Sequence, residues 1–403
     1  MEQIVNYNFF LSFLKACSLD KLSRENEANE AFVRTMLLAP SNKIREEIKR
    51  RYAKKYFEIE TVDKFITKIN THKIRILHGT MEIANQMYTY TSGLKRLGAY
   101  ARTLNYYNSY LNYKTDWNIP FHKISNDFIR KIIDQFEIFH FHFGTSLIPN
   151  KSDLPILKKL GKVLLMQYWG SDVRRKSIAE KFNPYAKVKV NEEVIKKDLE
   201  LVSQYIEHAI TDFVLFEYIV DYHKHLHYIP QAINLGNYQY KIKEPNEKLI
   251  IVHAPTSPEF KGTDYIIKSV NKLKKKYQIE FILVQGKSHD EAKKIYQNAD
   301  IVVDQLHSEG YGLFAIESMA MGKPVVTSIP DYYLKKYPER PPVIRANPDN
   351  IEEVLEKLIS NPRILPELGK KGREYVEKHH DIEKIKYDLL QLYYELSKEV
   401  KLL

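Results

Sequence analysis

The sequence predicts an α/β protein with two doubly wound, Rossmann-like domains that face each other across a cleft. From residue 73 onward, apolar runs of strand length alternate with amphipathic helical segments, which is typical of parallel sheets covered by helices. The alternation stops at the polar segment 236–248 and then begins again. A chain of 403 residues is also long enough for two cores of this kind.

Residues 1–72 differ from the rest of the chain and are predicted to form an α-helical N-terminal extension. They lack glycine and include a basic amphipathic segment at residues 42–56. Such a segment can bind a membrane surface, or it can pack on the next domain through Ile44, Ile48 and Tyr52. Peripheral membrane contact and protein contact through this extension both stay open.

The predicted N-terminal Rossmann-like domain covers residues 73–240 and would form one side of the cleft. Its strand at 134–144 alternates histidine with phenylalanine, and its strand at 163–170 ends in a polar turn. Further strands are expected at 74–79, 208–213 and 227–232, and helices at 81–97, 154–160, 192–205 and 216–223.

The predicted C-terminal Rossmann-like domain covers residues 241–383 and follows the same plan without repeating the sequence. Pro245 lies in the polar segment that separates the two domains. Strands are expected at 249–254, 279–284, 300–306, 324–329 and 343–345, and helices at 263–277, 289–298, 350–359 and 365–379. A last helix is expected at 382–402.

Composition limits the partners and the compartment. A net charge of +11 favours an anionic partner, either a nucleotide diphosphate, a nucleic acid or an anionic membrane, although the basic residues are spread as on an ordinary solvated surface. Cys17 is the single cysteine, which excludes an intrachain disulfide and fits a reducing cytoplasm. The sequence lacks a signal-peptide pattern and an apolar stretch long enough to span a bilayer. We therefore expect a cytoplasmic protein with at most peripheral membrane contact.

The stretch from Ser308 to Val326 carries the clearest chemistry. A buried strand leads into a glycine-bearing turn and a short helix that ends at Gly322. Unpaired N–H groups and the helix dipole at such a turn favour a phosphate. Glu309 and Glu317 bracket the turn, and carboxylates accept hydrogen bonds from hydroxyl groups. The pattern suits a ligand that is both phosphorylated and polyhydroxylated, such as a nucleotide-sugar.

Other polar residues and glycines also follow predicted strands. Ligands bind at the carboxyl ends of the strands in open α/β sheets, so these positions should line the cleft. The residues of this kind are Gly79, His142, Trp169, Asp172, Arg174, Lys261 and Gly286.

The C-terminal half resembles the retaining GT-B glycosyltransferases of glycosyltransferase family 4, also called glycosyl transferases group 1. The resemblance is carried by Glu309 to Leu313 with Glu317, by Lys261-Gly262-Thr263 and by Gly322-Lys323-Pro324. It extends over residues 73–403 and is strongest after residue 249. It implies a hexosyltransferase that uses a nucleotide-diphospho-sugar, with UDP favoured, and needs no metal or other cofactor. It also implies that residues 384–403 form a helix that crosses back onto the N-terminal domain.

The resemblance implies roles for the candidate residues. Glu309, His142 and Lys261 would be catalytic. Glu309 would face the donor sugar, His142 would lie near its 6-position, and Lys261 would neutralise the departing phosphate. The donor-binding residues would be Glu317 at the ribose, together with Gly79, Gly286, Gly310, Tyr311, Gly312 and Leu313. The acceptor-side residues would be Trp169, Asp172 and Arg174, with capping of the local turn as the alternative role for this group.

Two observations bear on the charges in the site. The loop from Pro255 to Lys261 lacks the arginine that relatives carry a few residues before the lysine, so Arg174 or Lys287 would have to provide the second cation. His140 and His142 share one strand face, as a pair of metal ligands would, but no third ligand lies nearby in the sequence. We therefore predict no metal site.

Together, the residues and the resemblance predict a retaining transferase that moves a sugar from a nucleotide-diphospho-sugar to an acceptor hydroxyl. Help from the departing phosphate in taking the acceptor's proton would remove the need for a separate base. An epimerase on the same fold and a non-catalytic nucleotide-sugar-binding or scaffold protein stay open as alternatives. Binding to nucleic acid is suggested by the charge alone, and we do not expect it.

Overall fold

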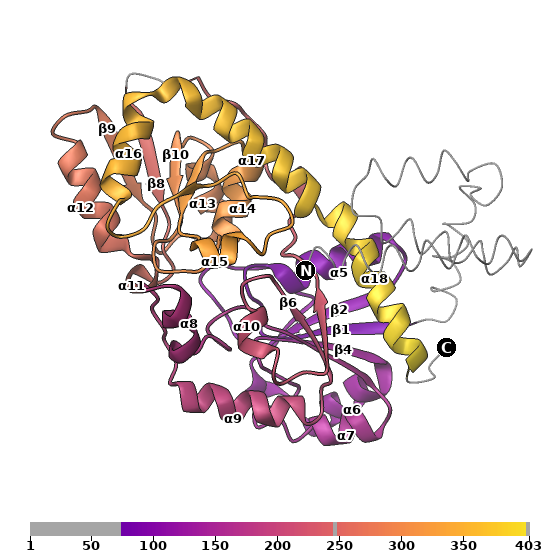
Figure 1. The fold of residues 1–403 in the computed structure, drawn as a ribbon. Coiled ribbons are helices and arrows are strands. Elements are labelled where there is room, and N and C mark those ends of the chain that lie inside the picture. Colours follow the sequence, from indigo (N-terminus) through magenta and orange to yellow (C-terminus); the bar gives the residue numbers. More distant parts are fainter. Residues whose placement is uncertain (1–73, 245–247, 400–403) are drawn as a thin grey trace, which may run out of the picture.

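The computed structural model describes residues 74–244 and 248–399, which form two parallel sheets flanked by helices and a long final helix (Figure 1). The two doubly wound units expected from the alternation of strands and helices are present. The predicted extension at residues 1–72 lies outside the described residues, and so do the last residues of the predicted helix at 382–402.

The first sheet has seven parallel strands in the order β3-β2-β1-β4-β5-β6-β7. The order changes direction between β1 and β4, and ligands bind at the carboxyl ends of strands beside such a switch point. The strands are β1 (Arg75–Thr80), β2 (Tyr100–Asn105), β3 (Trp117–Asn118), β4 (Ile138–His142), β5 (Val163–Gln167), β6 (His208–Thr211) and β7 (His225–Tyr228).

The sequence prediction missed β2 and β3. Their apolar pattern is weak, because β2 carries Arg102 and Thr103 and β3 has two residues. Asp116 holds this edge of the sheet: its carboxylate accepts a hydrogen bond from the Thr103 N–H at 2.9 Å and pairs with the Lys95 ammonium at 2.6 Å. Contacts with distant residues, rather than a local apolar run, therefore define these strands.

The first helix of this domain, α5 (Gln86–Arg96), begins later than the predicted start at Met81. The Glu82 carboxylate accepts hydrogen bonds from the backbone N–H groups of Met87 and Tyr88, each at 3.0 Å, and so caps the helix end. Burial raises the pKa of Glu82 to about 8. The other helices of this domain are α6 (Asn126–Gln135), α7 (Leu154–Lys159), α8 (Lys176–Phe182), α9 (Glu192–Ser203) and α10 (Phe216–Ile219).

The second sheet has five parallel strands in the order β12-β11-β10-β8-β9, and its switch point lies between β10 and β8. The strands are β8 (Leu249–His253), β9 (Ile279–Leu283), β10 (Ile301–Val303), β11 (Val325–Thr327) and β12 (Ile344–Arg345). The helices are α11 (Pro258–Lys261), α12 (Thr263–Leu273), α13 (His289–Tyr296), α14 (Leu313–Ala320), α15 (Asp331–Leu334), α16 (Ile351–Ser360) and α17 (Leu365–His379).

The final helix, α18 (Ile382–Glu399), leaves the second domain and packs on the first, where it lies against α5 (Figure 1). Leu389 and Tyr393 are fully buried and share one apolar core with Ile76 of β1 and Leu94 of α5. Burial of this helix face therefore ties the end of the chain to the first sheet.

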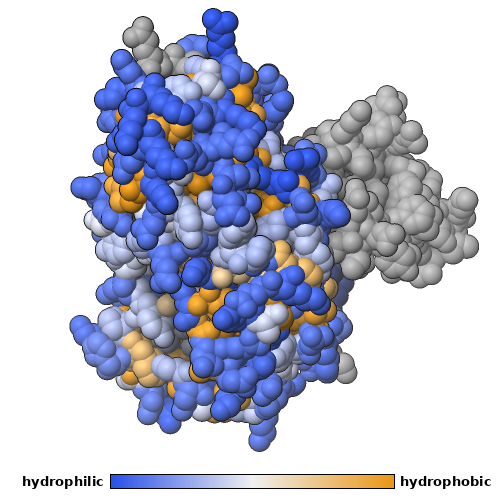
Figure 2. Space-filling view, turned by 60° about the vertical axis from the view of Figure 1, so that its left-hand side comes forward, coloured by the Kyte–Doolittle hydropathy of each residue, from blue (hydrophilic) through white to orange (hydrophobic). Residues whose placement is uncertain are grey.

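The surface shown in Figure 2 is largely hydrophilic, with apolar residues in small separate groups. Among residues 74–244 and 248–399, none of the helices combines the length and the apolar composition that crossing a bilayer requires.

Replacing Leu389 by Ala tests the docking of α18. The side chain is fully buried, so its truncation should lower the free energy of unfolding by about 2–5 kcal/mol. Urea denaturation followed by circular dichroism measures this change. Lys398→Ala, at an exposed position of the same helix, is the control and should change the value by less than about 0.5 kcal/mol. Equal losses for the two variants would contradict a specific docking contact.

Candidate functional site

The carboxyl ends of the two sheets meet at an ion pair between the domains. The Arg174 Nε atom, in the turn after β5, donates to the Glu309 carboxylate at 2.9 Å. The Tyr218 hydroxyl of α10 donates to the other Glu309 oxygen at 3.1 Å. Glu309 is fully buried and Arg174 is 8% exposed, so both charges depend on each other for compensation.

Two glycines, Gly170 and Gly310, allow the backbone to pass close to the side chains around this ion pair. A Cβ atom at Gly170, where φ is +136°, would lie 2.8 Å from a guanidinium nitrogen of Arg174. A Cβ atom at Gly310 would lie 2.9 Å from both the Val214 side chain of the first domain and the Tyr337 hydroxyl. A larger residue at Gly170 would displace the Arg174 guanidinium, and one at Gly310 would push against Val214 of the first domain.

A second ion pair lies beside the first and contains Lys261. Its ammonium donates to Asp304 Oδ1 and to Gln305 Oε1, each at 2.7 Å. The other Asp304 oxygen accepts the backbone N–H of Gly312 at 3.0 Å, directly before α14. Asp304 thus occupies the start of the helix, where the sequence predicts a phosphate. Sequence reasoning did not select Asp304, although its position directly after strand β10 was the available signal.

Glu317 lies within α14 and belongs to a different polar group from Lys261 and Asp304. Its carboxylate accepts hydrogen bonds from the Tyr238 hydroxyl at 2.8 Å and pairs with His289 Nε2 at 2.7 Å. Tyr238 and His289 also line a cavity of about 530 Å³ between the domains. The rest of its lining is mostly polar and comes from α5, the loop after β2, the segment joining the domains and the start of α13.

The remaining predicted donor residues lie in several places. Gly79 is inside β1, where it pairs with Leu104 and Phe141, rather than after the strand. Gly286 follows β9 in a left-handed conformation, with φ of +64°. The Tyr311 hydroxyl contacts Tyr375 and His380, and Leu313 opens α14.

The predicted acceptor-side residues bond mainly within their own turn and its surroundings. The Asp172 carboxylate accepts the backbone N–H groups of Trp169 and Gly170, at 3.1 and 2.7 Å, so it caps its own turn. Burial raises the pKa of Asp172 to about 6. The Trp169 indole N–H donates to His142 Nδ1 at 3.2 Å. Trp169 therefore separates His142 from the turn.

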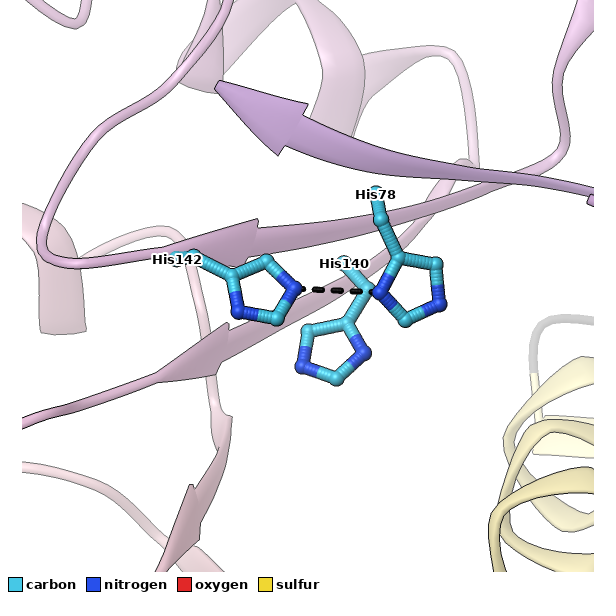
Figure 3. Close-up of side chains that lie close together, drawn as sticks. All are labelled: His78, His140 and His142. Carbon is cyan, nitrogen blue, oxygen red and sulfur yellow. Dashed lines mark hydrogen bonds between the residues drawn. The ribbon is translucent and has the colours of Figure 1, made fainter. Parts of the chain in front are cut away.

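His142 belongs to a buried cluster with His140 and His78, shown in Figure 3. His78 of β1 pairs in register with His140 of β4, and His142 follows two residues later on the same strand face. All three side chains are fully buried. Sequence reasoning found two of these histidines and missed His78, whose signal was its place on the neighbouring strand.

The hydrogen bonds of this cluster form a chain with one direction. Trp169 can only donate, so His142 carries its proton on Nε2 and donates to His78 Nδ1 at 3.0 Å. His78 Nε2 then donates to the Tyr393 hydroxyl of α18 at 2.9 Å. Tyr393 donates to His140 Nδ1 at 2.7 Å, which leaves the proton of His140 on a buried Nε2 atom without a hydrogen-bond partner.

The three histidines are the group that could hold a metal ion among the described residues, since one nitrogen from each lies within 4.8 Å of the others. The arrangement suits hydrogen bonding better than coordination. The rings of His140 and His142 are stacked at 17°, so their in-plane lone pairs do not point at one centre. The contact from Trp169 also places the His142 proton on the nitrogen that faces His78.

Comparison with known proteins relates part of the chain to one sequence family. Residues 220–375 match the sequence family described as glycosyl transferases group 1. The matched segment holds Lys261, Glu309 and Glu317, and the two facing sheets have the architecture of the GT-B fold.

Individual proteins resemble parts of the sequence or the whole fold. An uncharacterized glycosyltransferase of Methanocaldococcus jannaschii is 28% identical over 145 residues, which span 34% of this chain and 40% of that relative. Sucrose-phosphate synthase from Thermosynechococcus elongatus has a similar structure, with a TM-score of 0.55, 15% identity, and coverage of 81% of this chain and 100% of that one. Anabaena Alr3699/HepE in complex with UDP-glucose also has a similar structure, with a TM-score of 0.55 and 9% identity. The match covers 80% of this chain and 100% of that one.

Breaking the ion pair between the domains should be costly. Arg174→Met leaves a buried carboxylate without its cation, so the free energy of unfolding should fall by about 3–5 kcal/mol. The double variant Arg174→Met, Glu309→Gln removes both charges and should recover part of that loss. Chemical denaturation of both variants measures the difference, and additive losses in the double variant would contradict the pairing.

Acid should destabilise the protein through the histidine cluster. Burial lowers the pKa of His140 to about 3, whereas an unfolded histidine titrates near 6.5. As the pH falls, His140 therefore takes up a proton in the unfolded chain at a higher pH than in the folded protein. This stabilising contribution is complete above about pH 6.5 and is lost by about 1.4 kcal/mol per pH unit below it.

His140→Gln isolates this contribution. Urea denaturation at pH 7, 6 and 5 should give a free energy of unfolding that falls less steeply in the variant, by about 1.4 kcal/mol per pH unit. His122→Gln, at an exposed histidine, is the matched control. Parallel pH profiles for wild type and His140→Gln would show that His140 is not buried in its neutral form.

Proposed function

We propose that this protein is a retaining glycosyltransferase that moves a sugar from a nucleotide-diphospho-sugar, with UDP favoured, to an acceptor hydroxyl. The observation that carries the proposal is the placement of Glu309 and Glu317 around the start of α14. Glu309 lies at the contact of the two sheets, and Glu317 adjoins the cavity through Tyr238 and His289. The proposal assigns both carboxylates to one donor molecule.

The parts of the donor match the parts of the site. Glu317 binds the ribose hydroxyls, and the polar cavity beside it receives the nucleoside. Glu309 binds hydroxyls of the donor sugar. The diphosphate lies between them at the start of α14, where Lys261 and the helix N–H groups stabilise the negative charge that develops as the sugar–phosphate bond breaks.

The reaction needs few other groups from the protein. The leaving phosphate helps to take the acceptor's proton, so no side chain is assigned as a base. Positive charge from lysine and arginine serves the role that a metal ion plays at other phosphate sites, and we propose a metal-independent, cytoplasmic enzyme. The UDP and UDP-glucose bound by Anabaena Alr3699/HepE support the choice of donor class.

Two glutamine variants test the assignment. Glu309→Gln should lower kcat by about 10²- to 10³-fold, because a charged partner of the reacting sugar is lost. Glu317→Gln should mainly raise the donor KM, by about tenfold, because hydrogen bonds to ribose are made before and during the reaction. Glu353→Gln, at an exposed glutamate of α16, is the control.

The assay incubates purified protein with UDP-, GDP- and ADP-sugars and a set of hydroxylated acceptors, and follows nucleotide release and product configuration by NMR. Transfer with retained anomeric configuration supports the proposal. Conversion of the sugar to an epimer without nucleotide release would replace it with the epimerase alternative. Unchanged turnover in Glu309→Gln would remove this residue from the site.

A further inference from the structure

Three cations from the two domains lie near the end of α11. Two of them approach the ring of Phe260, the neighbour of Lys261: the Arg174 guanidinium carbon lies 5.3 Å from the ring centroid, and the Lys189 ammonium lies at the same distance. The third, the Lys261 ammonium, reaches Asp304 at the start of α14. Lys189 belongs to the segment between α8 and α9 and had no role in the sequence prediction.

Lys189 differs from the other two cations in its partners. Arg174 is paired with Glu309, and Lys261 is paired with Asp304. Within residues 74–244 and 248–399, no carboxylate lies at ion-pair distance from Lys189. Partial burial of its ammonium and the charges of Lys261 and Arg174 lower the pKa of Lys189, as expected for a cation held near other cations. Glu259 acts on Lys189 from beyond ion-pair distance and only partly offsets its charge, so Lys189 is the one cation of this group without an ion-pair partner among the described residues.

We propose that Lys189 and Arg174, both from the first domain, complete the diphosphate site together with Lys261. The inference rests on the function proposed above and names the residues that replace the arginine missing from the loop between Pro255 and Lys261. It moves Arg174 from the acceptor side to the donor side of the cleft. The diphosphate is then held by cations from both domains.

The existing ion pairs determine the order in which the cations meet the donor. Before the donor binds, Asp304 compensates the charge of Lys261 and Glu309 compensates the charge of Arg174. Lys189 meets the incoming diphosphate first. The diphosphate then takes Arg174 from Glu309, which frees the Glu309 carboxylate for the hydroxyls of the donor sugar. Donor binding and exposure of Glu309 are thereby coupled.

Binding of UDP to Lys189→Met tests the inference. Loss of a charge-assisted contact should raise the Kd of UDP by about 10- to 100-fold, measured by isothermal titration calorimetry on the full chain at low salt. Higher salt should weaken UDP binding more in wild type than in Lys189→Met, because exposed charges are screened. Thermal unfolding of the variant should match wild type, since Lys189 is exposed.

Lys181→Met is the matched control. Lys181 is also an exposed lysine of the first domain with its ammonium over a phenylalanine ring, Phe182, but that ring stacks on Tyr332 and does not belong to α11. Its Kd for UDP should equal that of wild type.

Each further outcome counts against a specific claim. If wild type binds UDP and Lys189→Met binds it equally well, the role of Lys189 is wrong and the proposed function stands. If wild type binds none of UDP, GDP, ADP and dTDP, the proposed function fails, and the inference fails with it.

Discussion

The buried ion pair between Arg174 and Glu309 is the contact on which the rest of the cleft depends. Neither charge reaches water freely, and each is compensated by a residue of the other domain. The pair fixes how the carboxyl ends of the two sheets face each other. Asn183 adds to this contact by donating its side-chain amide to the backbone carbonyls of His307 and Ser308. The position of the second domain's turn is thus set by side chains of the first.

Charge pairing extends from this contact through the whole site. A carboxylate of the protein occupies the place that an anionic ligand would take, with Asp304 at the start of α14. A buried charge without a partner is costly, so Lys261 and Arg174 are each paired with an internal carboxylate. An anionic ligand at these cations would have to exchange with those carboxylates, and its affinity would reflect that exchange rather than the sum of new contacts.

The histidine cluster differs from these ion pairs, because its polar atoms bond to one another and not to groups that a ligand could replace. Hydrogen bonds run in one direction from Trp169 through His142 and His78 to Tyr393 of α18 and end at His140, whose Nε2 atom has no partner. Tyr393 holds His78 and His140 in place, so the last helix supports the first sheet through hydrogen bonds as well as through its apolar face. His142, selected from sequence as a catalytic residue, has both ring nitrogens engaged within this chain.

The sequence by itself determined the elements that depend on local order: the alternation of strands and helices, the glycine-bearing turn between β10 and α14, and the two glutamates around it. Periodicity and turn chemistry are local, so they can be recognised in the chain. The tertiary structure decided which charges meet. Arg174 reaches Glu309 across 135 residues, His78 reaches His142 across 64, and Lys189 reaches the ring of Phe260 from the other domain. Spacing along the chain carries no sign of such pairs, because they arise when two separately folded sheets are brought face to face.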